Sequence, residues 1–219
     1  MKKICICMIV AAVVLMMGSC GNKSQQVPFD NGDSTDYAVD STLYGICGEG
    51  TSMNSLQMIT DTGDTLTIDI SAAREKGKVL GGLQVGDRMA VVPNGDKTEA
   101  KIVINQSTLL GNWVMPNPID GIDEVGIRIK EGGIAESIDQ SSIIYRTWRL
   151  VHGKLEIVLV RDGANDVEEQ EYYDIVKLQA DSLVYCDEEE TYEYSRQKPK
   201  ESYGEDIKLE DSNVEDFKM

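Results

Sequence analysis

His152 is the single histidine of the 219-residue chain, and it is the side chain most suited to general-base chemistry. A histidine does this work only with a nucleophile or an orienting partner within hydrogen-bond reach, and the sequence places neither beside it. His152 precedes Gly153, a pair typical of a solvent-exposed hairpin turn. Because the chain has no other histidine, catalytic mechanisms that need several histidines are excluded. A hydrolase using His152 with a nearby serine or aspartate is kept as one of three functional hypotheses.

Two acidic segments have the composition of sites for hard cations, which take oxygen ligands. They are Asp187–Glu190 and Asp162–Asp166. The first lacks the alternating ligand spacing and central glycine of a dedicated calcium loop, and the second resembles one in composition alone. We therefore expect a solvated face and a polar turn, and we predict no metal and no other cofactor.

The charge of the whole chain limits its partners. Thirty-eight acidic residues against 21 basic ones give a formal net charge of −17. Such a chain repels the phosphates of nucleic acid, so we predict no nucleic-acid partner. With 41% apolar residues it can nevertheless fold and is not wholly disordered.

The first 19 residues have the layout of a secretory signal. Two lysines precede an apolar run, Ile4–Met17, which is shorter than the roughly 20 residues needed to span a bilayer. Met17-Gly18-Ser19-Cys20 resembles a bacterial lipobox, with methionine in place of the usual leucine. The alternative is a signal-anchor helix with an incidental cysteine. The resemblance implies cleavage before Cys20, acylation of Cys20 with chains such as palmitate, and anchoring to the outer membrane of a Gram-negative cell, with the membrane face left open.

Removal of the signal changes the charge and the cysteine inventory. Two lysines and no acidic residue leave, so the net charge becomes 19 − 38 = −19. Residues 20–40 are polar, and we expect them to form a flexible tether. We expect residues 196–219 to form an acidic, disordered tail. Cys47 and Cys186 remain beyond the tether, and the sequence leaves open whether they pair or stay as free thiols.

The mature chain reads as all-β, with two small antiparallel barrels or barrel-like units. The first spans residues 41–106. Its strands at 55–60 and 64–70 flank the glycine-bearing turn Asp61–Gly63. Leu83-Gln84-Val85-Gly86-Asp87 before the next strand resembles the turn of small barrels of the OB or SH3 kind. Ser71 is the predicted N-cap of a short helix that ends at Gly77.

The second unit spans residues 107–195 and begins with Leu109-Leu110-Gly111-Asn112-Trp113. Short alternating strands follow. Leu109 to Tyr185 resembles the lipocalin-like family of bacterial envelope lipoproteins. The residues that carry the resemblance are Leu110–Trp113, Gly133–Ile138, Tyr145–Trp148, Lys177-Leu178 and Asp181–Val184. The resemblance implies an up-and-down barrel of seven or eight strands in which Trp113 plugs the closed end.

Three aromatic residues, Trp113, Tyr145 and Trp148, are the candidates for plugging the barrel or lining a ligand. Tyr145 and Trp148 are three positions apart, so a regular strand would point them to opposite faces. A barrel this short either fills its interior with side chains or holds one small ligand. We therefore expect a non-enzymatic, lipid-anchored envelope protein that binds a small apolar molecule or a partner protein. The alternative is a structural or assembly lipoprotein whose filled barrels are interaction surfaces.

Overall fold

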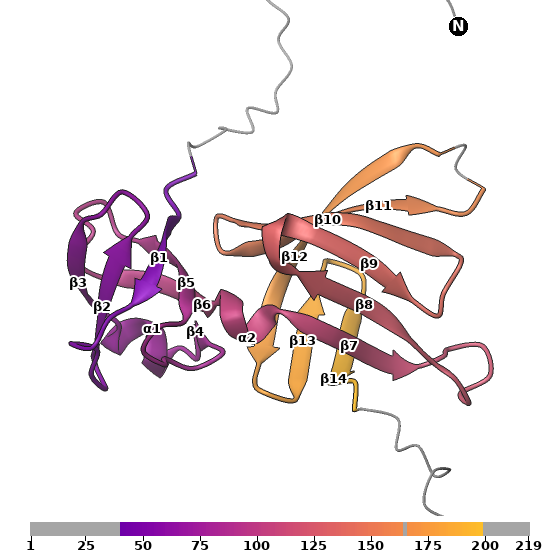
Figure 1. Ribbon diagram of the computed structural model, residues 1–219, viewed down its shortest axis with the longest axis horizontal. Coiled ribbons are helices and arrows are strands. Elements are labelled where there is room, and N and C mark those ends of the chain that lie inside the picture. The colour runs from indigo at the N-terminus through magenta and orange to yellow at the C-terminus, as the bar shows by residue number, and fades with distance from the viewer. Residues whose placement is uncertain (1–39, 164–165, 199–219) are drawn as a thin grey trace, which may run out of the picture. The chain divides into compact units, whose positions relative to one another are not determined.

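The computed structural model describes residues 40–163 and 166–198 (Figure 1). The predicted signal, Cys20, nearly all of the tether and the tail beyond residue 198 lie outside these residues. The chain divides into two compact units, residues 1–38 and 39–219, and every described residue belongs to the second. Within the described ranges, no helix combines the length and the apolar character needed to cross a bilayer.

The fold is all-β, as predicted. Its first part is a six-stranded sheet with the order β3-β2-β1-β5-β6-β4, and a short helix, α1, connects β3 to β4. Every pair in this sheet is antiparallel except β4–β6, which is parallel. The bounds are β1 Leu43–Cys47, β2 Ser55–Thr60, β3 Thr65–Asp69, α1 Ser71–Glu75, β4 Val79–Leu80, β5 Arg88–Pro93 and β6 Ala100–Asn105.

Alternation of apolar and polar residues builds this sheet around its own core. Leu56 and Met58 on β2 and Ile68 on β3 are fully buried, while the intervening side chains face outward. Gly63 closes the β2–β3 hairpin at a φ of +92°, which favours glycine. The predicted hairpin is therefore confirmed.

Two details of this sheet differ from the expectation. Ser71 begins α1 but does not cap it through its side chain: Ile70 is the N-cap, and the Asp69 carboxylate accepts a hydrogen bond from the Ser71 amide at 2.7 Å. The parallel β4–β6 pair also breaks a purely antiparallel pattern, because β4 lies beside β6 at the sheet edge and not beside β5, which follows it in the chain and runs antiparallel to β6. An isolated parallel bridge between Asp69, at the end of β3, and Glu99, just before β6, brings the two sides of the sheet together.

The second part is a closed eight-stranded barrel with the order β10-β11-β12-β13-β14-β7-β8-β9. The short helix α2 joins it to β6, and its N-cap, Asn105, accepts a hydrogen bond from the Thr108 amide at 2.9 Å. The bounds are α2 Gln106–Leu109, β7 Gly111–Pro116, β8 Glu124–Lys130, the 3₁₀ turn η1 Glu131–Gly133, β9 Ile134–Ile138, β10 Ile143–Val151, β11 Lys154–Arg161, β12 Glu168–Leu178, β13 Ser182–Cys186 and β14 Thr191–Arg196.

Large side chains pack into the barrel interior. Trp113, Ile127 and Leu155 have no exposed surface, and a group of tyrosines from β12, β13 and β14 packs with ring centroids 4.7–5.7 Å apart. The phenols of Tyr185 and Tyr194 are 3.1 Å apart and share a hydrogen bond. Of the two alternatives for the interior, the packed core is the one found.

The prediction that Tyr145 and Trp148 face opposite sides of their strand is wrong. The pairing of β10 with β11 shifts register between Tyr145 and Thr147, and two consecutive exposed residues, Arg146 and Thr147, lie between the two aromatics. This bulge adds one residue to the strand, so a spacing of three returns to the same face. Both aromatic side chains are buried in the barrel core.

The sheet and the barrel share a hydrophobic core. Leu80, Ala90 and Ile104 from the sheet belong to the same buried cluster as the barrel residues around Trp113. A Cβ on Gly153, in the β10–β11 turn, would lie 2.7 Å from the Ile102 side chain of β6, so this turn of the barrel packs closely against the sheet.

The cysteines do not link these parts. Cys47 and Cys186 are both free thiols, the first buried and the second half-buried. The Sγ of Cys47 lies 3.3 Å from the Thr51 hydroxyl, a local contact within the first sheet.

Candidate functional site

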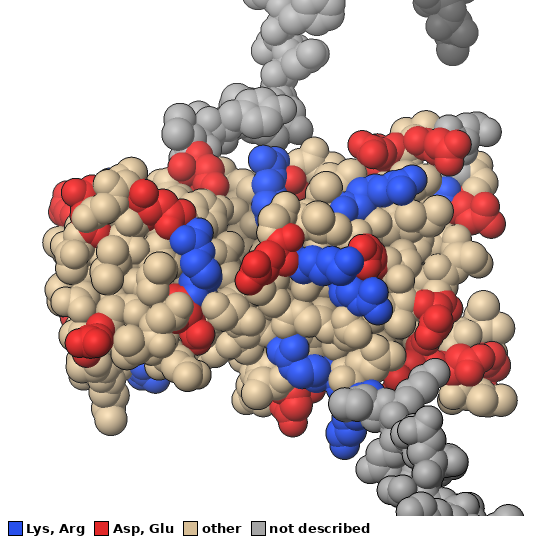
Figure 2. All heavy atoms as spheres, in the orientation of Figure 1, with Lys and Arg blue, Asp and Glu red and all other residues tan. Residues whose placement is uncertain are grey.

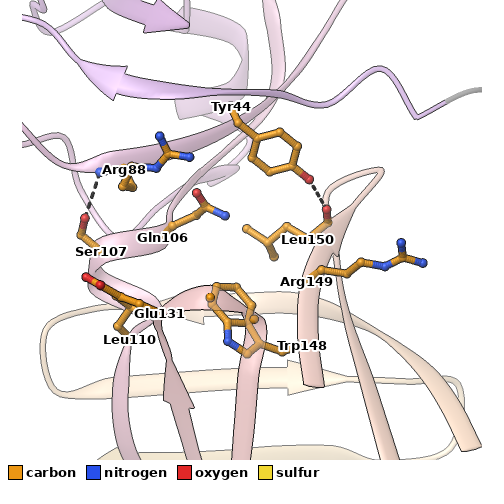
Figure 3. Close-up of a pocket in the computed structure, with 11 residues that line it drawn as sticks. Tyr44, Arg88, Gln106, Ser107, Leu110, Glu131, Trp148, Arg149 and Leu150 are labelled. Carbon is orange, nitrogen blue, oxygen red and sulfur yellow. Dashed lines mark hydrogen bonds between the residues drawn. The ribbon is translucent and has the colours of Figure 1, made fainter. Parts of the chain in front are cut away.

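A cleft of about 490 Å³ lies where the six-stranded sheet meets the barrel (Figure 3). Both parts contribute to its walls, and the polypeptide passes from one part to the other along it. The residues that line it are Tyr44, Arg88, Gln106, Ser107, Leu110, Glu131, Gly132, Gly133, Trp148, Arg149 and Leu150.

Short structural elements position these side chains. Tyr44 and Arg88 lie on neighbouring strands of the sheet, and α2 presents Gln106. On the barrel side, η1 lines the cleft with Gly132 and Gly133, which both have positive φ (+74° and +77°). The glycine pair therefore lets the backbone turn between β8 and β9 beside the cleft.

The floor of the cleft is apolar and firmly held. The Trp148 indole donates a hydrogen bond to the Lys130 carbonyl at 2.8 Å, so its polar edge is satisfied within the barrel wall. Trp148 is only 7% exposed, Leu150 is buried, and Leu110 is half-buried beside them. A ligand resting here would meet a preformed apolar surface.

The upper wall carries polar groups that are already oriented. The Tyr44 phenol donates a hydrogen bond to the Leu150 carbonyl, and burial, with the negative charge of Asp40 second, raises the pKa of Tyr44. Arg88 forms a two-point pair with Asp61 at 2.6 and 3.0 Å, which lowers the pKa of the Asp61 carboxyl. The pair uses two of the five N–H donors of the guanidinium, so Arg88 retains donors for a ligand.

Gln106 is the polar group best placed to recognise a ligand. Its amide projects into the middle of the cleft, between Tyr44 and Trp148 (Figure 3). No hydrogen bond joins the Gln106 side chain to the other lining residues (Figure 3), although an amide offers two donors and an acceptor. A polar group that enters the cleft can therefore bond to Gln106 without displacing an internal contact.

Trp113 lies in the barrel core, outside this cleft. Its indole donates to the Leu109 carbonyl at 2.8 Å, and the Arg196 guanidinium lies 4.2 Å from the ring centre. Arg196 also donates to the carbonyls of Thr108 and Leu110 at 2.8 and 2.9 Å. The tryptophan and arginine together fix the start of β7, where α2 leads into the barrel.

The three aromatic candidates thus occupy different places. All three belong to the buried core, and of the three only Trp148 also lines the cleft. Tyr44 and Gln106 were not predicted as site residues. They are far from Trp148 in sequence, and no local pattern marks a side chain that meets its partners only after the two parts of the fold associate.

His152 lies at the predicted hairpin turn, between β10 and β11, with a φ of +52° and a half-exposed side chain. Its partner is Asp40, which no sequence pattern marks: the Nδ1 of His152 is 3.6 Å from an Asp40 carboxylate oxygen, which also accepts a hydrogen bond from the His152 amide at 3.2 Å. Within the described residues no serine hydroxyl is hydrogen-bonded to the ring.

The acidic segment Asp187–Glu190 forms a turn, whereas residues 164 and 165 of the segment Asp162–Asp166 lie outside the described residues. The Asp187 carboxylate accepts the amides of Glu189 and Glu190 at 2.8 and 2.7 Å, which lowers its pKa. Across the described ranges, no group of three or more His, Cys, Asp or Glu side chains is arranged to hold a metal ion.

The barrel is similar to known proteins. Residues 105–197 match the model of a family described as lipocalin-like. A crystal structure of a lipocalin-like protein from Bacteroides thetaiotaomicron VPI-5482 is 32% identical, and the match covers 41% of this chain and 97% of that one, with a TM-score of 0.38. No curated protein matches the chain. On the family match and the sequence identity, the chain belongs to the lipocalin-like family through residues 105–197.

Proposed function

We propose that this protein is a non-enzymatic, lipid-anchored envelope protein that binds a small amphipathic molecule in the cleft between its sheet and its barrel. The cleft itself is the observation that carries the proposal. Its volume of about 490 Å³ falls in the range of roughly 300–1,000 Å³ that is usual for small-molecule sites. Trp148 and Leu150 offer an apolar surface, and the free amide of Gln106 offers a hydrogen-bonding group opposite.

The packed barrel interior argues for this location over a ligand inside the barrel. Trp113 and the tyrosines of β12–β14 occupy the space that a ligand would need. The role of the barrel is then to hold Trp148 and Leu150 rigidly at one wall of the cleft. Such rigid support lowers the entropic cost of binding.

The two arginines of the cleft, which line it together with the carboxylate of Glu131, also fit binding better than catalysis. Arg88 and Arg149 are held by Asp61 and Glu156, and arginine stays protonated at any ordinary pH, so neither can move a proton. A lipocalin-like fold likewise favours a binding module. The proposal therefore assigns Arg88, which retains free donors, to orienting a polar group of the ligand.

Anchoring rests on Cys20, which the lipobox resemblance makes the acylated N-terminus. The segment between Cys20 and Asp40 would then connect the outer membrane to the compact unit. Growth of an expressing Gram-negative strain with an alkyne analogue of palmitate should label the wild-type protein and leave the Cys20→Ser variant unlabelled. Labelling of both proteins would contradict the anchor.

A structural or assembly role is the second candidate, and the packed barrel interior favours it. In that case the outer surfaces of the protein would bind envelope proteins, and crosslinking in cells should trap one defined partner. The cleft would then take up no small molecule.

Native mass spectrometry separates the two candidates. The chain from Gly21 onward, which includes the whole compact unit 39–219, would be incubated with an extract of envelope lipids and small molecules. A retained mass supports the binding function. A spectrum of bare protein alone contradicts it and favours the assembly role.

A further inference from the structure

At the end of the barrel away from α2, two isoleucines are exposed beside a groove. Ile119 and Ile122 are 93% and 84% exposed in the loop between β7 and β8. Ile122 lines a groove of about 1,020 Å³ together with Val114, Met115 and Pro116. Isolated exposed apolar residues are common, but a pair at the edge of a large, partly apolar groove indicates a surface that a partner covers.

The charge around this groove is strongly one-sided. In an antiparallel barrel every second connection lies at the same end, so the loops after β7, β9, β11 and β13 share one end. These four connections contain nine acidic residues and no lysine or arginine: Asp120, Asp123, Asp139, Asp162, Asp166 and Asp187–Glu190. Figure 2 shows acidic side chains gathered at this end of the barrel.

The basic residues of the groove do little to offset this charge. Arg196 donates hydrogen bonds to backbone carbonyls and packs over the face of Trp113. Lys198 is the one other basic residue in the lining. Against them, Asp123, Glu124 and Asp139 face the same groove. Summed over the four loops, the potential attracts cations to this end of the protein.

We propose that this groove is a docking surface for a basic amphipathic peptide segment of another protein. The apolar residues of such a segment would cover Ile119, Ile122 and Met115, while its lysines or arginines would face the acidic loops. Charge selects this occupant over two others. A second copy of the protein would bring the same acidic loops, and the segment 199–219 of this chain carries seven acidic residues against three basic ones, a net charge of −4, so both would be repelled.

The test uses the chain from Gly21 onward and two fluorescent probes of equal length. One is a short amphipathic peptide of lysine and leucine, and the other has glutamate in place of lysine. Binding is measured by fluorescence anisotropy at low and at high salt. The lysine peptide should bind and weaken as salt rises, and the glutamate peptide should not bind.

Two variants and one control locate the binding. Ile119→Ser with Ile122→Ser should weaken binding of the lysine peptide at least tenfold, at little cost in stability because both side chains are exposed. Glu188→Lys with Glu189→Lys should weaken it several-fold and flatten the salt dependence. The control, Glu49→Lys with Glu75→Lys, makes the same charge change on exposed residues of the first sheet and should stay within twofold of wild type.

Several results would overturn the proposal. They are absence of binding, equal binding of the glutamate peptide, and unchanged affinity in both loop variants. A dimer in sedimentation that the Ile119→Ser, Ile122→Ser variant abolishes would assign the groove to a second copy. Binding by a chain that ends at Lys198, but not by the longer chain, would assign it to residues 199–219.

Discussion

Tyr44 on β1 donates its phenolic hydrogen bond to the carbonyl of Leu150 on β10, a residue 106 positions further along the chain. The bond joins the first sheet to the barrel at the edge of the cleft, and both residues line that cleft. The position of the upper wall relative to the floor therefore depends on a contact between the two parts of the fold.

Tyr44→Phe should lower the free energy of unfolding by about 0.5–1.5 kcal/mol, because it removes this hydrogen bond and little else. Denaturant titration measures the change. Tyr172→Phe is the control, since the Tyr172 side chain is 46% exposed and its phenol bonds only on the surface. Equal stability of wild type and Tyr44→Phe would show that the bond does not hold the cleft together.

Ile104→Ala on β6 should destabilise the barrel as well as the sheet, by about 2–5 kcal/mol, because Ile104 is buried in the core that the two parts share. Both tryptophans, Trp113 and Trp148, lie in the barrel. Tryptophan fluorescence and far-ultraviolet circular dichroism should therefore report one common unfolding transition, displaced in the variant. Two separate transitions, with the fluorescence transition unmoved by Ile104→Ala, would show independent folding.

Gly111→Ala should destabilise the barrel by about 1–3 kcal/mol or more, because Gly111 has a φ of +133°. A Cβ there would also lie 2.2 Å from the Arg196 guanidinium, which would have to leave its place over Trp113. Thermal unfolding followed by tryptophan fluorescence measures the loss. Gly95→Ala is the matched control, since a Cβ at Gly95 meets nothing within 4 Å. Similar melting temperatures for the two variants would contradict the account of Gly111.

The buried tyrosines predict a loss of stability at alkaline pH. Burial raises the pKa of Tyr185 well above its ordinary value of 10, and it does the same for Tyr173 and Tyr194. The unfolded chain releases these protons near pH 10 and the folded protein does not. Their contribution is thus complete below about pH 10 and falls above it, by about 1.4 kcal/mol per pH unit for each group.

Denaturant titrations between pH 8 and pH 11.5 measure this slope, and Tyr185→Phe should make it shallower. Absorbance at 295 nm gives a second check, because the buried phenols should ionise only as the protein unfolds. Ionisation of all tyrosines near pH 10 in the folded protein would contradict the prediction.

The strands were predictable because their signals are local. Alternation of apolar and polar residues marked the strand predicted at 64–70, and glycine-bearing turns marked the hairpins at Gly63 and Gly153. The bulge after Tyr145 was missed because one extra residue in a strand leaves no sign in composition, yet it reverses the face of every later side chain.

The cleft was not predictable for a different reason. It joins Tyr44, Gln106 and Trp148, which come from a strand of the sheet, a connecting helix and a barrel strand. Each of these residues has an ordinary local explanation, as a strand aromatic, a helix residue or a core residue. Their common site arises only from the association of the sheet with the barrel.

Ligand capture by cleft variants tests the proposed function most directly. Gln106→Trp places a large ring in the centre of the cleft, and Gln84→Trp, at an exposed position outside the lining, is its matched control. After incubation with envelope extract, native mass spectrometry should show a retained molecule on the wild type and on Gln84→Trp and none on Gln106→Trp. Equal retention by both variants, or retention by none of the three proteins, would contradict a binding site in this cleft.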